Sequence, residues 1–216
     1  MLEHVLNLGN QLKTDLDTSE GFTSVDYEKI VIVGMGGSGV AGDVLKLILN
    51  QYTNIDVEVR KTYNLTKTQI AARPFCLFIS YSGNTEETIS VAKDAIDENL
   101  EWAAISSGGE LLDLATKHNK KFVKVPDGLQ PRAAFGLMTK AVVNYLPNQT
   151  KKIFINACEE AGNYLNNLTE DASNEVFEIS KDIANQIGSK TAVIYAGSDL
   201  TYLVCLLYTS DAADDP

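Results

Sequence analysis

Short apolar runs alternate with segments of helical spacing along the first 150 residues. The run Lys29-Ile30-Val31-Ile32-Val33 is rich in β-branched residues and lacks polar alternation, which is typical of a strand buried on both faces of a parallel sheet. Similar runs recur at 55–59, 75–80, 102–106 and 122–125, with helical patterns such as 85–99 and 110–117 between them. This alternation predicts an α/β fold: a three-layer αβα domain around a five-stranded parallel sheet.

Helical patterns flank the predicted sheet. Apolar residues at helical spacing indicate an amphipathic N-terminal helix within 1–25, ahead of a sheet domain spanning 26–150. Pro131 is expected in the first turn of a helix that runs to Leu146. A helical linker is predicted over 151–190, and the buried-strand pattern at 191–198 indicates that a second α/β unit starts within 191–204.

The last twelve residues, 205–216, look like a translated sequencing adapter rather than natural protein sequence. We therefore expect a non-native tail there and leave it out of the fold prediction. On this interpretation the natural reading frame continues past Val204, and the chain is an N-terminal fragment whose second α/β unit is truncated.

Composition narrows the possible classes of function. Hydrophobic residues make up 44% of the 216, and no apolar run reaches the roughly 18 to 20 residues that span a bilayer. The formal net charge of -11 argues against nucleic acid as a partner, because backbone phosphates require a basic surface. Three widely spaced cysteines and two distant histidines predict neither a disulfide framework nor a metal site. We expect a cytoplasmic protein without a membrane anchor.

The run Ser80-Tyr81-Ser82-Gly83-Asn84-Thr85, here called the serine turn, connects a predicted strand to a helix. Backbone N–H groups at a helix start lack intrahelical partners, and the helix dipole is positive there. Gly83 allows a ligand to approach closely, and the hydroxyls of Ser80, Ser82 and Thr85 can donate to phosphate oxygens. The alternative is an ordinary N-cap made by Ser82 or Asn84. Three hydroxyls exceed what a cap needs, so the turn predicts a phosphate site.

The glycine-rich segment Gly34-Met35-Gly36-Gly37-Ser38-Gly39 also fits G-x-G-x-x-G, the pattern of dinucleotide-binding folds. In those folds an acidic residue closes the second strand, whereas Asp56 and Glu58 lie early in theirs. Because carboxyl ends of parallel strands meet at one edge, this loop is better explained as a second wall of the serine-turn site. Dinucleotide binding is the competing interpretation.

Arg132 follows the last predicted strand, within Gly128-Leu129-Gln130-Pro131-Arg132, and is therefore expected at the same edge of the sheet. A guanidinium there can stabilise negative charge on a developing enediolate. The alternative is a surface arginine at a helix start.

Together these three segments resemble sugar isomerase (SIS) domain proteins, and most closely the bifunctional phosphoglucose/phosphomannose isomerases of archaea and some bacteria. The resemblance covers about residues 1 to 204 and implies two SIS domains, a homodimer of the full-length protein and no metal or other cofactor. The implied reaction interconverts glucose 6-phosphate or mannose 6-phosphate with fructose 6-phosphate through a cis-enediol. The implied roles are phosphate binding by the serine turn (Ser80, Ser82, Gly83, Asn84, Thr85), sugar contact by Gly36, Gly37 and Ser38, and catalysis at C1–C2 by Arg132.

The family draws its proton-transferring base and ring-opening groups from the second domain. The resemblance places these groups beyond Val204, so the 216-residue chain is expected to bind sugar phosphate weakly and to turn over little or nothing. Two other classes stay open: a non-catalytic sugar-phosphate sensor and an amidotransferase-type sugar isomerase. The short acidic N-terminus counts against the first, and the lack of a preceding nucleophile domain counts against the second.

Overall fold

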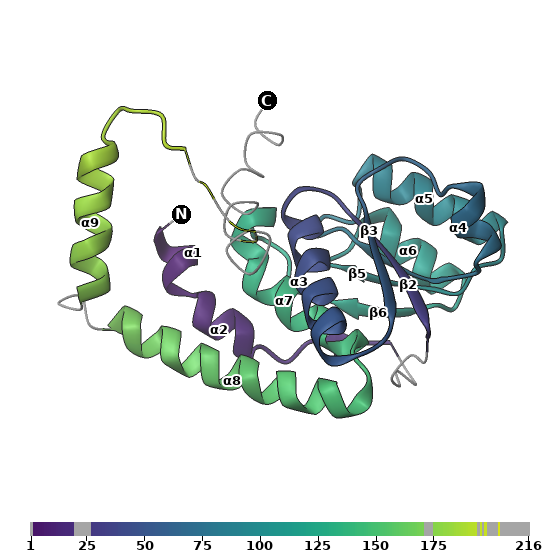
Figure 1. The fold of residues 1–216 in the computed structure, drawn as a ribbon, viewed down its shortest axis with the longest axis horizontal. Coiled ribbons are helices and arrows are strands. Elements are labelled where there is room, and N and C mark those ends of the chain that lie inside the picture. The colour runs from purple at the N-terminus through teal and green to yellow at the C-terminus, as the bar shows by residue number, and fades with distance from the viewer. Residues whose placement is uncertain are drawn as a thin grey trace.

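The computed structural model describes residues 2–19, 27–170 and 175–193, together with 195, 197 and 203. A twisted sheet forms the middle layer, with helices on both faces (Figure 1). Its strands are β1 Asp17–Thr18, β2 Lys29–Gly34, β3 Asp56–Arg60, β4 Phe75–Ile79, β5 Trp102–Ser106 and β6 Lys121–Lys124. They are ordered β1-β6-β5-β4-β2-β3, and all neighbours pair in parallel except β1 and β6.

The predicted α/β class and the five parallel strands are confirmed, and the sheet gains a sixth, antiparallel strand. That strand, β1, has only two residues, Asp17 and Thr18, which pair with Lys124 and Val123. Both residues of β1 are exposed, so no apolar alternation marks it in the sequence. It covers the free edge of β6.

The described part of the chain contains eleven helical segments. They are α1 Leu2–Leu6, α2 Leu8–Lys13, α3 Gly36–Tyr52, α4 Lys67–Ala71, α5 Glu86–Asp97, α6 Gly109–Lys117, the 3-10 helix η1 Pro131–Ala134, α7 Phe135–Val142, the 3-10 helix η2 Val143–Tyr145, α8 Asn148–Glu170 and α9 Glu175–Ile187. The helix predicted from Pro131 to Leu146 is thus divided into η1, α7 and η2.

Alternate residues of each central strand enter two separate cores. On β2, Ile30 and Ile32 join the core beneath α3 and α7, whereas Val31 and Val33 join the core beneath α5 and α6. All four side chains are fully buried. This explains the unbroken apolar runs in the sequence, since a strand covered on both faces needs no polar side.

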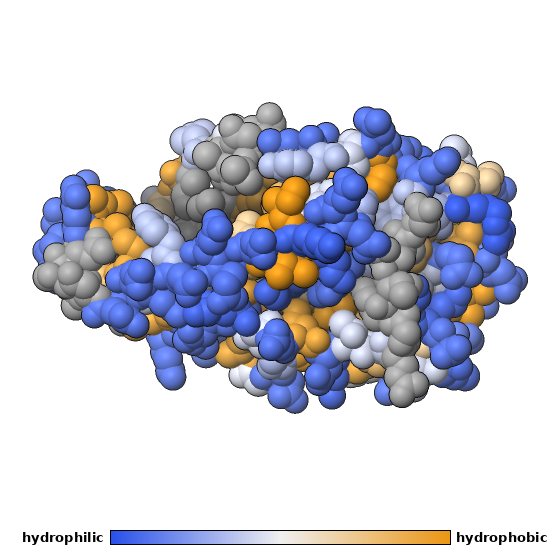
Figure 2. Space-filling view, turned by 90° about the horizontal axis from the view of Figure 1, so that it is seen from below, coloured by the Kyte–Doolittle hydropathy of each residue, from blue (hydrophilic) through white to orange (hydrophobic). Residues whose placement is uncertain are grey.

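Helix α2 packs against the long helix α8, on the same side of the sheet as α7 (Figure 1). Asn166 Nδ2 donates to Asn10 Oδ1 at 2.7 Å, and Lys13 Nζ donates to Asn163 Oδ1 at 2.7 Å. Seen from below in Figure 2, the surface over α8 is largely hydrophilic, which fits a helix that buries one side only.

The predicted N-terminal helix occupies the first half of 1–25, ending at Lys13. Residues 194, 196 and 198 of the predicted strand at 191–198 lie outside the described residues, and its described residues, 191–193, 195 and 197, carry no strand. The tail 205–216 lies wholly outside them. Within the described part of the chain, no helix is both long and apolar enough to cross a bilayer.

Candidate functional site

Four loops leave the carboxyl ends of β2, β4, β5 and β6 at one edge of the sheet. The strand register aligns these ends, because Gly34 pairs with Ile79, Ile79 with Ile105, and Ser106 with Lys124. The loops are the glycine-rich loop, the serine turn, the β5–α6 loop of residues 106–109 and the β6–η1 segment that leads to Arg132. Three of them are the segments that the sequence singled out.

The serine turn is held by its own hydroxyl groups. Ser80 is fully buried, and its Oγ lies 2.8 Å from Thr85 Oγ1 in a shared hydrogen bond. The Gly83 N–H donates to Ser80 Oγ at 3.1 Å, and the Asn84 N–H donates to Ser82 Oγ at 3.3 Å. Ser82 itself is exposed. Its hydroxyl therefore faces solvent, while those of Ser80 and Thr85 fix the shape of the turn.

Helix α5 starts directly behind this turn, with Thr85 as the N-cap residue. Thr85 makes no side-chain capping bond, because its hydroxyl is engaged with Ser80 instead. The ordinary N-cap alternative therefore does not describe Thr85, and neither Ser82 nor Asn84 occupies the cap position. The first-turn N–H groups and the positive end of the helix dipole can then serve an anion.

Two carboxylates stand beside those donors in the first turn of α5, Glu86 and Glu87. Glu86 is exposed, and Glu87 is half-buried. Hydrogen bonding to the Glu87 carboxylate raises the pKa of the Tyr63 phenol. The edge thus combines short-range hydrogen-bond donors with two neighbouring carboxylates.

Gly83 and Asn84 join the serine turn to the β5–α6 loop. Gly83 has φ +72°, and a Cβ there would run into the carbonyl oxygen of Gly108. Asn84 Oδ1 accepts the Glu110 N–H at 3.0 Å, in the first turn of α6. The structure therefore uses the Asn84 side chain to bind the neighbouring loop.

The glycine-rich loop lies against both other predicted segments. Ser38 is buried, and its Oγ accepts the Tyr81 N–H at 3.0 Å. A Cβ on Gly37 would lie 3.4 Å from the Pro131 carbonyl oxygen and 3.5 Å from the Arg132 backbone nitrogen. Gly36 opens α3 with φ +49°. The expected convergence of the loop, the turn and the arginine segment is present.

Arg132 is half-buried in η1, and the N-terminal helix α2 holds the segment that follows it. Gln11 of α2 is 3% exposed, and its Nε2 donates to the Ala133 carbonyl at 2.7 Å. Its Oε1 accepts the N–H groups of Gly136 at 3.0 Å and Leu137 at 3.3 Å. Gln11 was not predicted from the sequence, although a polar residue inside an apolar helical pattern is the signal that marks it.

The β5–α6 loop is a second feature that the sequence analysis missed. Ser107 Oγ donates to the Tyr81 carbonyl at 2.7 Å, and Ser106 Oγ donates to the Gly108 carbonyl at 2.7 Å. The run Ser106-Ser107-Gly108-Gly109 follows a buried strand as the serine turn does, so its small polar residues could have identified it.

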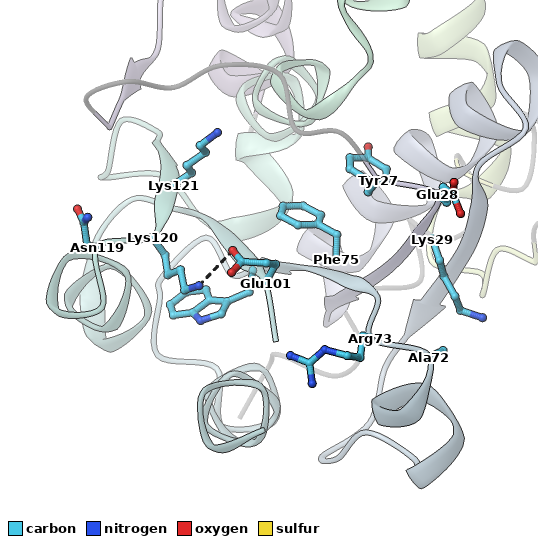
Figure 3. A pocket seen from close by; sticks show the side chains of 11 residues that line it. Tyr27, Glu28, Lys29, Ala72, Arg73, Phe75, Glu101, Asn119, Lys120 and Lys121 are labelled. Atoms are coloured by element: carbon cyan, nitrogen blue, oxygen red, sulfur yellow. Dashed lines mark hydrogen bonds and ion pairs between the residues drawn. The ribbon is translucent and has the colours of Figure 1, made fainter. Parts of the chain in front are cut away.

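A hollow of about 540 Å³ lies at the opposite, amino end of the sheet (Figure 3). Two of its cations are engaged by neighbouring groups: Lys120 Nζ lies 3.2 Å from Glu101 Oε2, and Arg73 Nη2 donates to the Asn99 carbonyl at 2.6 Å. None of the predicted site residues lines it. The hollow and the four-loop edge are therefore separate features.

Comparison with known proteins agrees with this fold. The sequence pattern of the SIS domain matches residues 25–122, so this part of the chain is similar to SIS domains. A solved Bacillus subtilis structure, provisionally named a phosphosugar isomerase, matches with a TM-score of 0.59 at 17% identity. The match covers 97% of this chain and 64% of that one, and it supports the fold alone.

Within that class, the chain is similar over most of its length to bifunctional phosphoglucose/phosphomannose isomerases. The protein of that name from Caldicellulosiruptor bescii is 30% identical over 94% of this chain and 62% of its own length. A D-glucosamine-6-phosphate 4-epimerase from Sulfolobus acidocaldarius is 33% identical over 80% of this chain and 53% of its own. The chain thus spans less than two thirds of the length of these relatives.

Proposed function

We propose that this chain provides the phosphosugar-binding domain of an isomerase that interconverts glucose 6-phosphate or mannose 6-phosphate with fructose 6-phosphate. The observation that carries the proposal is the meeting of the glycine-rich loop, the serine turn and the Arg132 segment at one edge of the sheet. The names of curated relatives at 30% identity and above support the phosphosugar class.

In this proposal the phosphate lies at the start of α5. The exposed Ser82 hydroxyl and first-turn N–H groups donate to its oxygens, and Ser80 and Thr85 can exchange their mutual bond for bonds to the ligand. Gly36, Gly37 and Ser38 then form the wall along the sugar. Close backbone approach at Gly37 leaves Arg132 beside that wall.

The chemistry proposed for this edge is proton transfer between C2 and C1. A base removes the C2 proton of the open-chain aldose, and the electron pair forms the C1–C2 double bond while the carbonyl oxygen becomes an alkoxide. The O1 alkoxide then takes up a proton as O2 loses its own, and protonation at C1 gives the ketose. Arg132 stabilises the oxygen charge of the cis-enediolate. We propose that the base and the ring-opening group come from residues beyond Val204. The chain alone would then bind sugar phosphate without efficient turnover.

Calorimetric titration of glucose 6-phosphate, fructose 6-phosphate, glucosamine 6-phosphate and NAD tests this function. Ser82→Ala combined with Thr85→Ala removes two hydroxyls from the phosphate, each bond being charge-assisted and worth about 1.5 to 3 kcal/mol. We expect sugar-phosphate binding to weaken by roughly tenfold or more, while any binding of free glucose stays unchanged.

Thr116→Ala is the matched control for that double variant. Thr116 is an exposed threonine of α6 whose hydroxyl bonds to the Leu112 carbonyl, away from the serine turn. Its loss should leave all affinities unaltered. Tight NAD binding without sugar-phosphate binding would overturn the proposal, as would equal losses for glucose and its phosphate. If the isolated chain binds sugar phosphate as tightly as the full-length protein does, and the full-length protein does not isomerise the sugar, a sugar-phosphate sensor is favoured.

A further inference from the structure

Tyr81 lies inside the serine turn, yet its side chain points into the protein rather than toward solvent. The side chain is 5% exposed and belongs to the apolar core beneath α3 and α7. Its neighbour Ser82 is exposed. The residue therefore connects the candidate phosphate site to the body of the domain.

The backbone of Tyr81 binds two of the other three loops. Its N–H donates to Ser38 Oγ in the glycine-rich loop at 3.0 Å. Its carbonyl oxygen accepts the Ser107 N–H at 2.9 Å and the Ser107 hydroxyl at 2.7 Å, both from the β5–α6 loop. These bonds fix the glycine-rich and β5–α6 loops beside the turn whatever side chain stands at position 81.

The hydroxyl of Tyr81 binds the remaining loop, the segment that leads to Arg132. It donates to the Pro126 carbonyl at 2.9 Å and accepts the Leu129 N–H at 3.0 Å. Leu129 lies three residues before Arg132. A phenol has one O–H to donate, and this one is used while the oxygen also accepts, so both ends of the Pro126–Leu129 bend are tied to one atom.

Burial keeps this hydroxyl in its protonated, donating form, since burial raises the pKa of Tyr81. Asp127, within the bend, acts in the same direction through its charge, whereas the bond from the Leu129 N–H opposes the shift. The double tie is consequently maintained across the neutral pH range.

We infer that Tyr81 is the positioning residue that sets Arg132 and the sugar wall at a fixed distance from the phosphate grip. The inference rests on the proposed function and deepens it: the ligand must be a sugar whose phosphate and reacting carbons span that distance. Phosphate alone needs only the turn and the start of α5. A phosphosugar needs the turn and the tied loops together, and small misplacements of a reacting group are costly.

Tyr81→Phe tests this division, because it removes the hydroxyl and leaves the ring and every backbone bond in place. We expect the Kd for inorganic phosphate to stay within about twofold and the Kd for glucose 6-phosphate to rise about fivefold to tenfold. Hydrogen exchange of the Leu129 amide should quicken in the same variant, since its acceptor is gone.

Tyr27→Phe is the matched control. Its hydroxyl is also partly buried and donates to a backbone carbonyl, that of Tyr145, at 2.6 Å, but it lies at the amino end of the sheet. This variant should lose comparable stability without changing either affinity.

The outcomes separate this inference from the function beneath it. If the wild-type chain binds neither phosphate nor glucose 6-phosphate, both proposals fall. If it binds both ligands and Tyr81→Phe weakens them equally, or weakens neither, the proposed function stands and the positioning role is wrong. Faster exchange at Leu129 together with selective loss of glucose 6-phosphate supports the role, and an unchanged exchange rate contradicts it.

Discussion

The two ends of the same sheet differ in how their polar groups are arranged. At the carboxyl end, four loops of small and hydroxyl-bearing residues bond to one another through Ser38, Tyr81 and Ser107. At the amino end, a hollow of about 540 Å³ is lined by long charged side chains, several of which are engaged in ion pairs or bonds to backbone, as Lys120 is with Glu101. The volume of a hollow alone does not make a binding site, because a small anion needs several hydrogen-bond donors that point toward it.

The largest effect is expected from disturbing the contact between the serine turn and the β5–α6 loop at the carboxyl end. Gly83→Ala forces a side chain onto a backbone with φ +72° and into the Gly108 carbonyl oxygen. We expect the free energy of unfolding to fall by roughly 3 to 5 kcal/mol, and binding of glucose 6-phosphate to be lost. Chemical denaturation monitored by circular dichroism measures the first effect.

Gly128→Ala separates strain from collision. Gly128 also has a positive φ, +87°, but a Cβ there meets nothing within 4 Å. Its cost should therefore be about 1 kcal/mol, from the backbone conformation alone. Equal losses of unfolding free energy in the two variants would show that the collision with the Gly108 carbonyl oxygen adds nothing to the cost of Gly83→Ala.

A smaller effect is expected from removing the anchor of the arginine segment. Gln11→Leu keeps an apolar contact but leaves the Ala133 carbonyl and the Gly136 and Leu137 N–H groups without their buried partner. We expect a loss of about 2 to 3 kcal/mol in thermal or chemical unfolding. Asn10→Ala, which removes an exposed bond to Asn166, serves as the comparison and should cost less than about 1 kcal/mol. A Gln11 variant as stable as wild type would show that α2 does not hold the arginine segment in place.

The smallest effect is predicted at the amino end. Arg73→Gln with Lys120→Gln removes two cations from the hollow and breaks the pair between Lys120 and Glu101. Exposed pairs contribute about 0 to 1 kcal/mol, so stability should change little, and the Kd for glucose 6-phosphate should stay within about twofold. A large drop in affinity would mean that the two ends are not independent.

The sequence predicts the carboxyl end well because its signals are local. Buried β-branched strands, the Gly34–Gly39 loop and the hydroxyls of the serine turn are each visible within six residues. Parallel pairing then requires their loops to meet, so the convergence of Ser38, Gly37 and Arg132 follows from topology.

The parts that escaped prediction depend on contacts between distant residues. Gln11 bonds to residues more than 120 positions away, and the Tyr81 hydroxyl reaches across 45 and 48 positions. A glutamine in an amphipathic helix and a tyrosine in a turn look ordinary until tertiary packing gives them partners. The two-residue strand β1 is similar, since only its pairing with β6 defines it.

Glu86 and Glu87 at the start of α5 bear on how a ligand arrives rather than how it is held. A phosphate dianion approaching this edge is repelled by these two carboxylates and by a chain of net charge -11. Ionic strength screens such repulsion beyond about 8 Å under physiological conditions. Added salt should therefore speed association here, the reverse of its effect at basic phosphate sites. Recognition then depends on contact geometry, and anions that cannot complete the hydrogen bonds gain nothing from their charge.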